Sequence, residues 1–113
     1  MRIYVNDVRE SSAPTDIRLS NTKINENVAS YTTVGTFSTT DPDAGDTFTY
    51  ALVSGTGDRD NAAFVINDDR LRIKSSPDYD TQSSYKIRVR TTDADGETYE
   101  EEFTVNILSL IHI

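Results

Sequence analysis

The chain has 113 residues, close to the commonest size of a single domain, and it can bury only a modest core. Its 19 acidic and 11 basic residues give a formal net charge of −8, which argues against nucleic acid and anionic membrane surfaces as partners. Cysteine is absent and the one histidine is His112, so the sequence lacks the residues of a disulfide framework, a zinc site or a histidine-assisted nucleophile. We therefore expect the chain not to be an enzyme and to have no catalytic residues.

Short runs of alternating apolar and polar residues, typical of half-buried strands, follow one another along most of the chain. They are expected at residues 17–19, 34–37, 48–52, 64–66, 71–73, 85–89 and 103–107. Turn-forming clusters of Asp, Asn, Gly, Ser and Pro separate them, and no helix longer than one turn is expected. The pattern predicts an all-β fold, a Greek-key β-sandwich of about seven strands.

The last two predicted strands are joined by the turn-forming segment T-D-A-D-G-E. Antiparallel pairing of these strands would set Arg88 and Arg90 near Glu100 and Glu102, which is a favourable cross-strand arrangement. Glu101 falls on the inward-facing side of its strand. We therefore expect a bulge at that residue, or a position at the rim of the sheet.

Five small groups of acidic residues are confined to the polar stretches between the predicted strands. They are N-D-V-R-E (6–10), N-E-N (25–27), D-P-D (41–43), D-Y-D (78–80) and T-D-A-D-G (92–96). Carboxylates gathered in this way repel one another unless a cation lies among them. Because the groups offer oxygen ligands and neither His nor Cys, they indicate Ca²⁺ as the ion. Ordinary turn chemistry of Asp and Asn is the alternative for each group.

The two ends of the chain differ in character from the segment between them. Residues 3–5 have the pattern of a strand end and are followed by a polar linker, which predicts that residues 1–12 are the end of a preceding repeat plus an interdomain linker. Residues 13–107 then form one complete domain. Residues 108–113 form an anomalous tail, and no carboxylate side chain follows Glu102. No apolar stretch is long enough to span a membrane, so we expect any export signal or anchor to lie outside this fragment.

The motifs in their order along the chain, from the linker through N-E-N, D-P-D and D-Y-D-T-Q-S-S-Y to the late T-D, resemble the cadherin-like repeat of tandem arrays in bacterial surface and secreted proteins. The resemblance spans residues 6–107. It implies a cadherin- or immunoglobulin-like sandwich in a large extracellular or cell-surface adhesion protein, with calcium rigidifying the junctions between repeats. The implied partners are neighbouring repeats of the same chain, together with another adhesin or a cell-surface glycan. The implied role is homophilic or other cell adhesion, without direct membrane insertion by this fragment.

The resemblance divides the candidate calcium ligands between the two ends of the domain. At the junction with the preceding repeat it implies Asp7, Glu10, Asp41, Asp43 and Asp93. Arg9 and Ser11 stand where the linker of the family has Asn, and these departures reduce the number of ligands at this junction. At the opposite end the resemblance implies Glu26, Asp78 and Asp80. Their partners would lie in the next linker, and the tail supplies no carboxylate for it.

Two other functions stay open. A carbohydrate-binding sandwich would stack sugars on exposed aromatic rings, and because the chain has no Trp the candidates are Tyr31, Tyr79 and Tyr99. A calcium-independent structural spacer would use its acidic residues only as turn formers and solvated charges. Asp95 is expected to be a simple turn residue. Solvated loop charges are expected at Asp46, Asp58, Asp60, Asp68 and Asp69.

Overall fold

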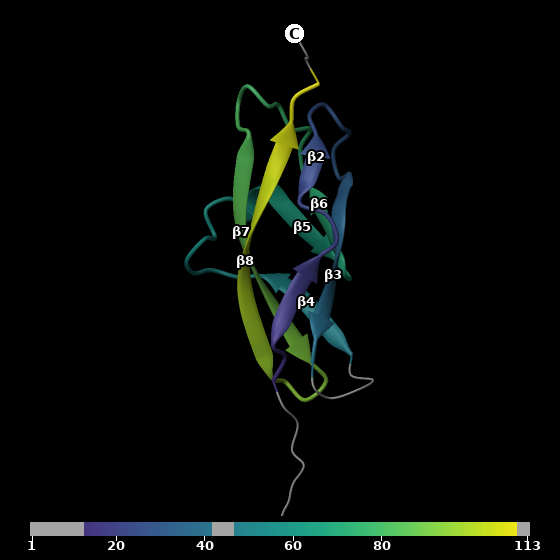
Figure 1. Cartoon of the computed structure of the whole chain (residues 1–113), viewed down its shortest axis with the longest axis vertical. Coiled ribbons are helices and arrows are strands. Elements are labelled where there is room, and N and C mark those ends of the chain that lie inside the picture. The colour runs from purple at the N-terminus through teal and green to yellow at the C-terminus, as the bar shows by residue number, and fades with distance from the viewer. Residues whose placement is uncertain (1–12, 42–46, 111–113) are drawn as a thin grey trace, which may run out of the picture.

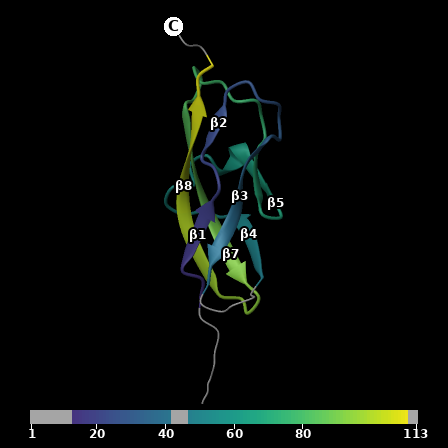
Figure 2. The same cartoon turned by 45° about the vertical axis from the view of Figure 1, so that its right-hand side comes forward.

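The computed structural model describes residues 13–41 and 47–110 of the chain. The strands in this part of the chain are β1 (Asp16–Leu19), β2 (Lys23–Asn25), β3 (Thr33–Thr40), β4 (Phe48–Leu52), β5 (Phe64–Asn67), β6 (Arg70–Ile73), β7 (Ser84–Asp93) and β8 (Thr98–Leu108), with one 3₁₀ turn, η2 (Asn61–Ala63). They form two four-stranded sheets in the orders β1-β3-β6-β5 and β2-β8-β7-β4 (Figure 1, Figure 2). None of these described segments is a helix with the length and hydropathy needed to cross a membrane.

The structure confirms the predicted all-β sandwich and adds β2 to the strands that were expected. The chain crosses from one sheet to the other between β1 and β2, so β1 pairs antiparallel with β3 while β2 pairs in parallel with β8. At the crossing, a Cβ on Gly35 would lie 2.8 Å from the backbone oxygen of Asn21, so only glycine fits there without a shift. The side chain of Asn21 donates a hydrogen bond to the carbonyl of Val34 at 3.1 Å, which holds the crossing against β3.

Most of the apolar residues that alternation placed on the inner faces form the core between the two sheets. Those that are buried are Ile17, Ile24, Val34, Phe37, Phe64, Leu71, Ile73, Ile87, Val89, Val105 and Ile107. Phe37 stacks on Tyr50 across the sheets, with 5.2 Å between the ring centroids. The hydroxyl of Thr39 lies 2.7 Å from that of Tyr50 and 2.9 Å from that of the fully buried Thr91. This short polar network satisfies the hydroxyl groups inside the core and links β3 to β4 and β7.

The β7–β8 hairpin carries the longest register of the fold, nine residue pairs without a shift. The expected cross-strand charge pairs are present, but one carboxylate receives both arginines. Arg88 Nε lies 2.8 Å from Glu100 Oε1, and Arg90 Nη2 lies 2.7 Å from Glu100 Oε2. The carboxylate of Glu102 instead lies against Gly57, whose positive φ of 83° is a backbone conformation that other residues rarely adopt.

Glu101 has the inward-facing position that the alternation predicts, and the expected bulge is wrong because Glu101 pairs with Val89 in regular register. Its Oε1 accepts a hydrogen bond from the backbone N–H of Ile17 in β1 at 3.4 Å. Burial is the largest cause of the raised pKa of Glu101; the N–H of Ile17 opposes it, and the neighbouring carboxylate of Asp16 adds to it. An ionised Glu101 therefore acts against folding.

Replacing Glu101 with Gln is expected to raise stability at neutral pH. The amide oxygen of Gln can still accept the N–H of Ile17, and the substitution removes the carboxylate. Because the pKa of Glu101 is raised in the folded state, its contribution to the stability of the parent chain is present at acid pH and is lost as pH rises through the folded pKa. Because solvent screens part of the effect, the gain should stay below about 1 kcal/mol. Thermal unfolding from about pH 4 to about pH 8 measures it. A variant that is less stable than the parent at pH 7, with the exposed Glu102→Gln as control, would contradict the assignment.

The loop that follows β4 covers the first half of the β7 edge, which β4 does not reach. Val53 donates its N–H to the carbonyl of Arg88, and the Asn61 side-chain oxygen accepts the N–H of Arg88, both at 3.0 Å. Asp60 donates its N–H to the carbonyl of Lys86 at 2.9 Å and accepts the N–H of Lys86 on Oδ2 at 2.8 Å. The loop thus continues the hydrogen-bonded ladder with side chains and protects the edge from pairing with another chain.

Asp60 is not the solvated charge that the sequence suggested. Its carboxylate also accepts hydrogen bonds from Gln82 Nε2 at 3.1 Å and Arg59 Nε at 3.0 Å. Burial alone would raise the pKa of Asp60, but the hydrogen bonds from Lys86, Gln82 and Arg59 outweigh it and lower the pKa below its ordinary value. Asp60 therefore stabilises the fold when ionised, and this contribution is lost as pH falls through the folded pKa.

Asp60→Ala is expected to lower the free energy of unfolding by about 1–3 kcal/mol at neutral pH, because the N–H of Lys86 loses its acceptor and the loop loses its main anchor. Urea unfolding measures the loss. The matched control is Asp69→Ala, in which an exposed aspartate of another turn is removed with the same change in charge. Equal stability of the two variants would show that the loop does not depend on Asp60.

Candidate calcium sites at the two ends of the domain

The acidic candidates gather at opposite ends of the sandwich. At the end where β3 and β7 finish (the N-terminal end), Asp41 directly follows β3 and Asp93 is the last residue of β7 (Figure 1). At the other end (the C-terminal end), Glu26 follows β2, and residues 78–80 lie in the loop between β6 and β7. The other candidates, Asp7, Glu10 and Asp43, lie outside the described residues.

Asp93 is the most constrained carboxylate at the N-terminal end, with 5% of its surface exposed. Its Oδ1 accepts two backbone hydrogen bonds from the β7–β8 turn, one from the N–H of Asp95 at 3.0 Å and one from the N–H of Glu97 at 2.9 Å. Its Oδ2 is buried and has no hydrogen-bond partner within the described structure. The turn therefore fixes the direction of the carboxylate and leaves one oxygen without a donor.

A buried carboxylate oxygen without a donor is costly for a folded protein, unless a cation supplies the missing partner. A hard cation such as Ca²⁺ prefers carboxylate oxygens of this kind. Asp41 is half-buried and lies at the same end of the sandwich, directly after the last residue of β3. The donor chemistry at the N-terminal end therefore fits calcium.

Glu26 is the buried carboxylate of the C-terminal end, with 6% of its surface exposed. Here both oxygens already have donors. Oε1 accepts the backbone N–H of Tyr79 at 3.2 Å, and Oε2 accepts the backbone N–H of Leu110 at 2.7 Å. Glu26 and the segment 78–80 are thus brought together, but by hydrogen bonds from the backbone.

Both carboxylate oxygens of Asp78 also accept hydrogen bonds from nearby groups. Its Oδ1 accepts the N–H of Asp80 at 3.0 Å, and its Oδ2 accepts the hydroxyl of Thr81 at 3.1 Å, which is ordinary turn chemistry. The side chain of Asp80 is exposed. No three acidic or histidine side chains among residues 13–41 and 47–110 come close enough to hold a metal ion together, so Glu26, Asp78 and Asp80 do not form such a group. At this end, as at the N-terminal end, the described side chains by themselves do not make up a full set of calcium ligands.

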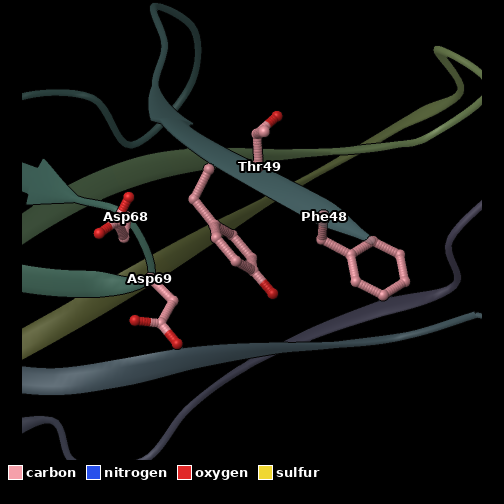
Figure 3. Close-up of a pocket in the computed structure, with 5 residues that line it drawn as sticks. Phe48, Thr49, Asp68 and Asp69 are labelled. Carbon is pink, nitrogen blue, oxygen red and sulfur yellow. The ribbon is translucent and has the colours of Figure 1, made fainter. Parts of the chain in front are cut away.

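A pocket of about 410 Å³ lies at the open side of the sandwich, between β4 and the β5–β6 turn (Figure 3). Its walls are Phe48, Thr49, Tyr50, Asp68 and Asp69. The last two residues had been expected only as solvated loop charges. Both aspartates line the pocket and are exposed to solvent.

The tyrosines that a carbohydrate-binding function would need differ in exposure. Tyr31 and Tyr79 are exposed, at 53% and 41%. Tyr99 is partly buried and packs against the core from β8. Tyr79 lies in the loop held by Glu26, whereas Tyr31 donates its N–H to the carbonyl of Ile73.

Comparison with known proteins places this sandwich in a family. The Cadherin domain family model matches residues 20–108. A search of curated protein sequences found no match. The structure resembles domains EC1-2 of human protocadherin-24 (TM-score 0.67, 17% identity, 88% of this chain and 44% of that one) and domains EC1-2 of human mucin-like protocadherin (0.65, 18%, 93% and 57%). It also resembles the human desmocollin-1 ectodomain (0.65, 20%, 92% and 21%).

This chain spans between a fifth and three fifths of the length of those three chains. At identities below a quarter, the structural likeness establishes the fold alone. The family match covers the chain from the crossing before β2 to the last residue of β8. The chain therefore belongs to the cadherin domain family.

Proposed function

We propose that the chain is a calcium-stabilised repeat of a large extracellular or cell-surface adhesion protein, of the kind that forms tandem arrays on bacteria. It acts by binding and by rigidity, without catalysis. Neighbouring repeats of the same chain are its first partners, and its net charge of −8 disfavours nucleic acid. Family membership supports the adhesive role, since the matched structures are cadherin ectodomain segments.

One observation carries the calcium part of the proposal: the buried Oδ2 of Asp93, which has no donor in the described structure while Oδ1 is held by two N–H groups. Asp41 and Asp43 would supply further oxygens from the segment after β3, and Asp7 and Glu10 would supply them from the linker before the domain. Bound calcium would provide the positive charge that these carboxylates otherwise lack.

Such an ion would join the linker to two loops of the domain, so a flexible connection between repeats would become a stiff one. The affinity of this chain by itself is expected to be low, about 10⁻⁴ to 10⁻³ M, the range of extracellular calcium-binding modules. The function is therefore mechanical: calcium keeps the array extended so that the parent protein can reach a partner on another surface.

Asp93→Asn tests the proposal. The amide oxygen can still accept the N–H groups of Asp95 and Glu97, while an uncharged amide nitrogen replaces the buried oxygen. About 10 mM CaCl₂ should raise the free energy of unfolding of the parent chain by about 1.4–2.7 kcal/mol, through binding to the folded state alone. The variant should gain nothing from calcium and should be at least as stable as the parent in EGTA. Thermal unfolding with and without calcium measures both effects.

The matched control is Asp95→Asn, which removes one charge from an exposed position of the same turn and should keep the calcium response. The Asp41→Asn/Asp43→Asn double variant should lose the response as Asp93→Asn does. If Asp93→Asn responds to calcium like the parent, Asp93 is not a ligand. If the parent does not respond, even with the preceding repeat attached, the chain is a calcium-independent spacer.

A further inference from the structure

The buried carboxylates at the two ends of the domain differ in their hydrogen-bond donors. At the N-terminal end an oxygen of Asp93 has no donor within the described structure, whereas at the C-terminal end both oxygens of Glu26 have one. The two side chains are almost equally buried, at 5% and 6% exposure, so desolvation does not distinguish them. The difference lies in what the surrounding backbone offers to the carboxylate.

Glu26 connects three segments that meet at the C-terminal end. Its own N–H donates to the carbonyl of Leu108 at the end of β8, at 3.0 Å. Its Oε2 accepts the N–H of Leu110, two residues further along. Its Oε1 accepts the N–H of Tyr79 from the loop before β7, and Asn27 donates its N–H to the carbonyl of Pro77 in the same loop at 2.9 Å. The end of β2, the loop 77–79 and the chain leaving β8 are therefore held by one residue and its neighbour.

We infer that Glu26 is a hydrogen-bonded clasp that closes the C-terminal end of the domain without a cation. The inference rests on the proposed function in one respect, since it limits calcium binding to the N-terminal end. Hydrogen bonds from N–H groups to an ionised carboxylate are the strong kind, and burial strengthens them. The clasp fixes the path of the chain up to Leu110, so the exit from the domain is set by the fold itself.

The contact with the departing segment supports this assignment. What it offers Glu26 is a backbone N–H, that of Leu110, at the short distance of 2.7 Å. The other acidic residue facing this loop, Asp78, holds Asp80 and Thr81 and does not complete a group of three around a metal. Every described carboxylate oxygen of Glu26 and Asp78 is therefore used by a local donor.

Amide hydrogen exchange on the full 113-residue chain, followed by NMR in EGTA and in CaCl₂, tests the clasp. The amides of Tyr79 and Leu110 are expected to be protected in EGTA, and to the same degree when calcium is added. In Glu26→Gln one of the two acceptor oxygens becomes an NH₂ group that cannot accept a hydrogen bond, so the protection of Tyr79 or of Leu110, whichever N–H faces that group, should fall roughly tenfold to hundredfold. Asp80→Asn is the matched control, because it removes a charge from the same loop at an exposed side chain.

Calcium dependence of the Leu110 amide in the parent chain would overturn the inference, as would unchanged protection of both Tyr79 and Leu110 in Glu26→Gln. The calcium-induced rise in unfolding temperature gives a second readout: it should survive in Glu26→Gln and be lost in Asp93→Asn. Loss of the calcium response in Glu26→Gln would make the C-terminal end a calcium site after all. If the parent chain does not respond to calcium, the proposed function fails, while protection of Tyr79 and Leu110 in EGTA and the loss of protection at one of them in Glu26→Gln still establish the clasp.

Discussion

The pairing of β7 with β8 is the constraint on which the rest of the sandwich depends. Nine residue pairs in one unbroken register place apolar residues of both strands on the inner face and charged residues on the outer face. Each neighbouring element then attaches to this hairpin: β4 and the loop after it cover one edge, and β2 covers the other. The turn of the hairpin also holds Asp93, so the same pairing that organises the core sets the geometry of the N-terminal end.

A carboxylate that becomes buried on folding needs a hydrogen-bond donor or a cation, and the carboxylates of this chain have several kinds of partner. Glu100 receives two arginines, and Asp60 receives backbone and side-chain donors. Glu26 receives two backbone N–H groups from separate segments. Glu101 faces another carboxylate and keeps a raised pKa. Asp93 is left with a buried Oδ2 that nothing in the described structure satisfies, and for that reason it is a good candidate for a cation ligand.

The fold could be predicted from the sequence wherever a strand was long enough to alternate. Ile87, Val89, Val105 and Ile107 are buried as their spacing indicated. The crossing to β2 could not be predicted, because a three-residue strand with one buried side chain carries no periodic signal and its parallel pairing depends on residues more than eighty positions away.

The same limit applies to the candidate sites. Sequence motifs placed Glu26 and Asp93 among the acidic candidates, since the motifs are local. They could not show that Leu110 donates to Glu26, or that Asp60 caps the edge of β7, because these bonds join segments that only the fold brings together.

The parallel contact between β2 and β8 has a mechanical consequence. Tension that pulls the two ends of the domain apart loads this pair in shear, so its hydrogen bonds resist together and do not open one at a time. A repeat built in this way can carry force along an array while its loops remain free to vary.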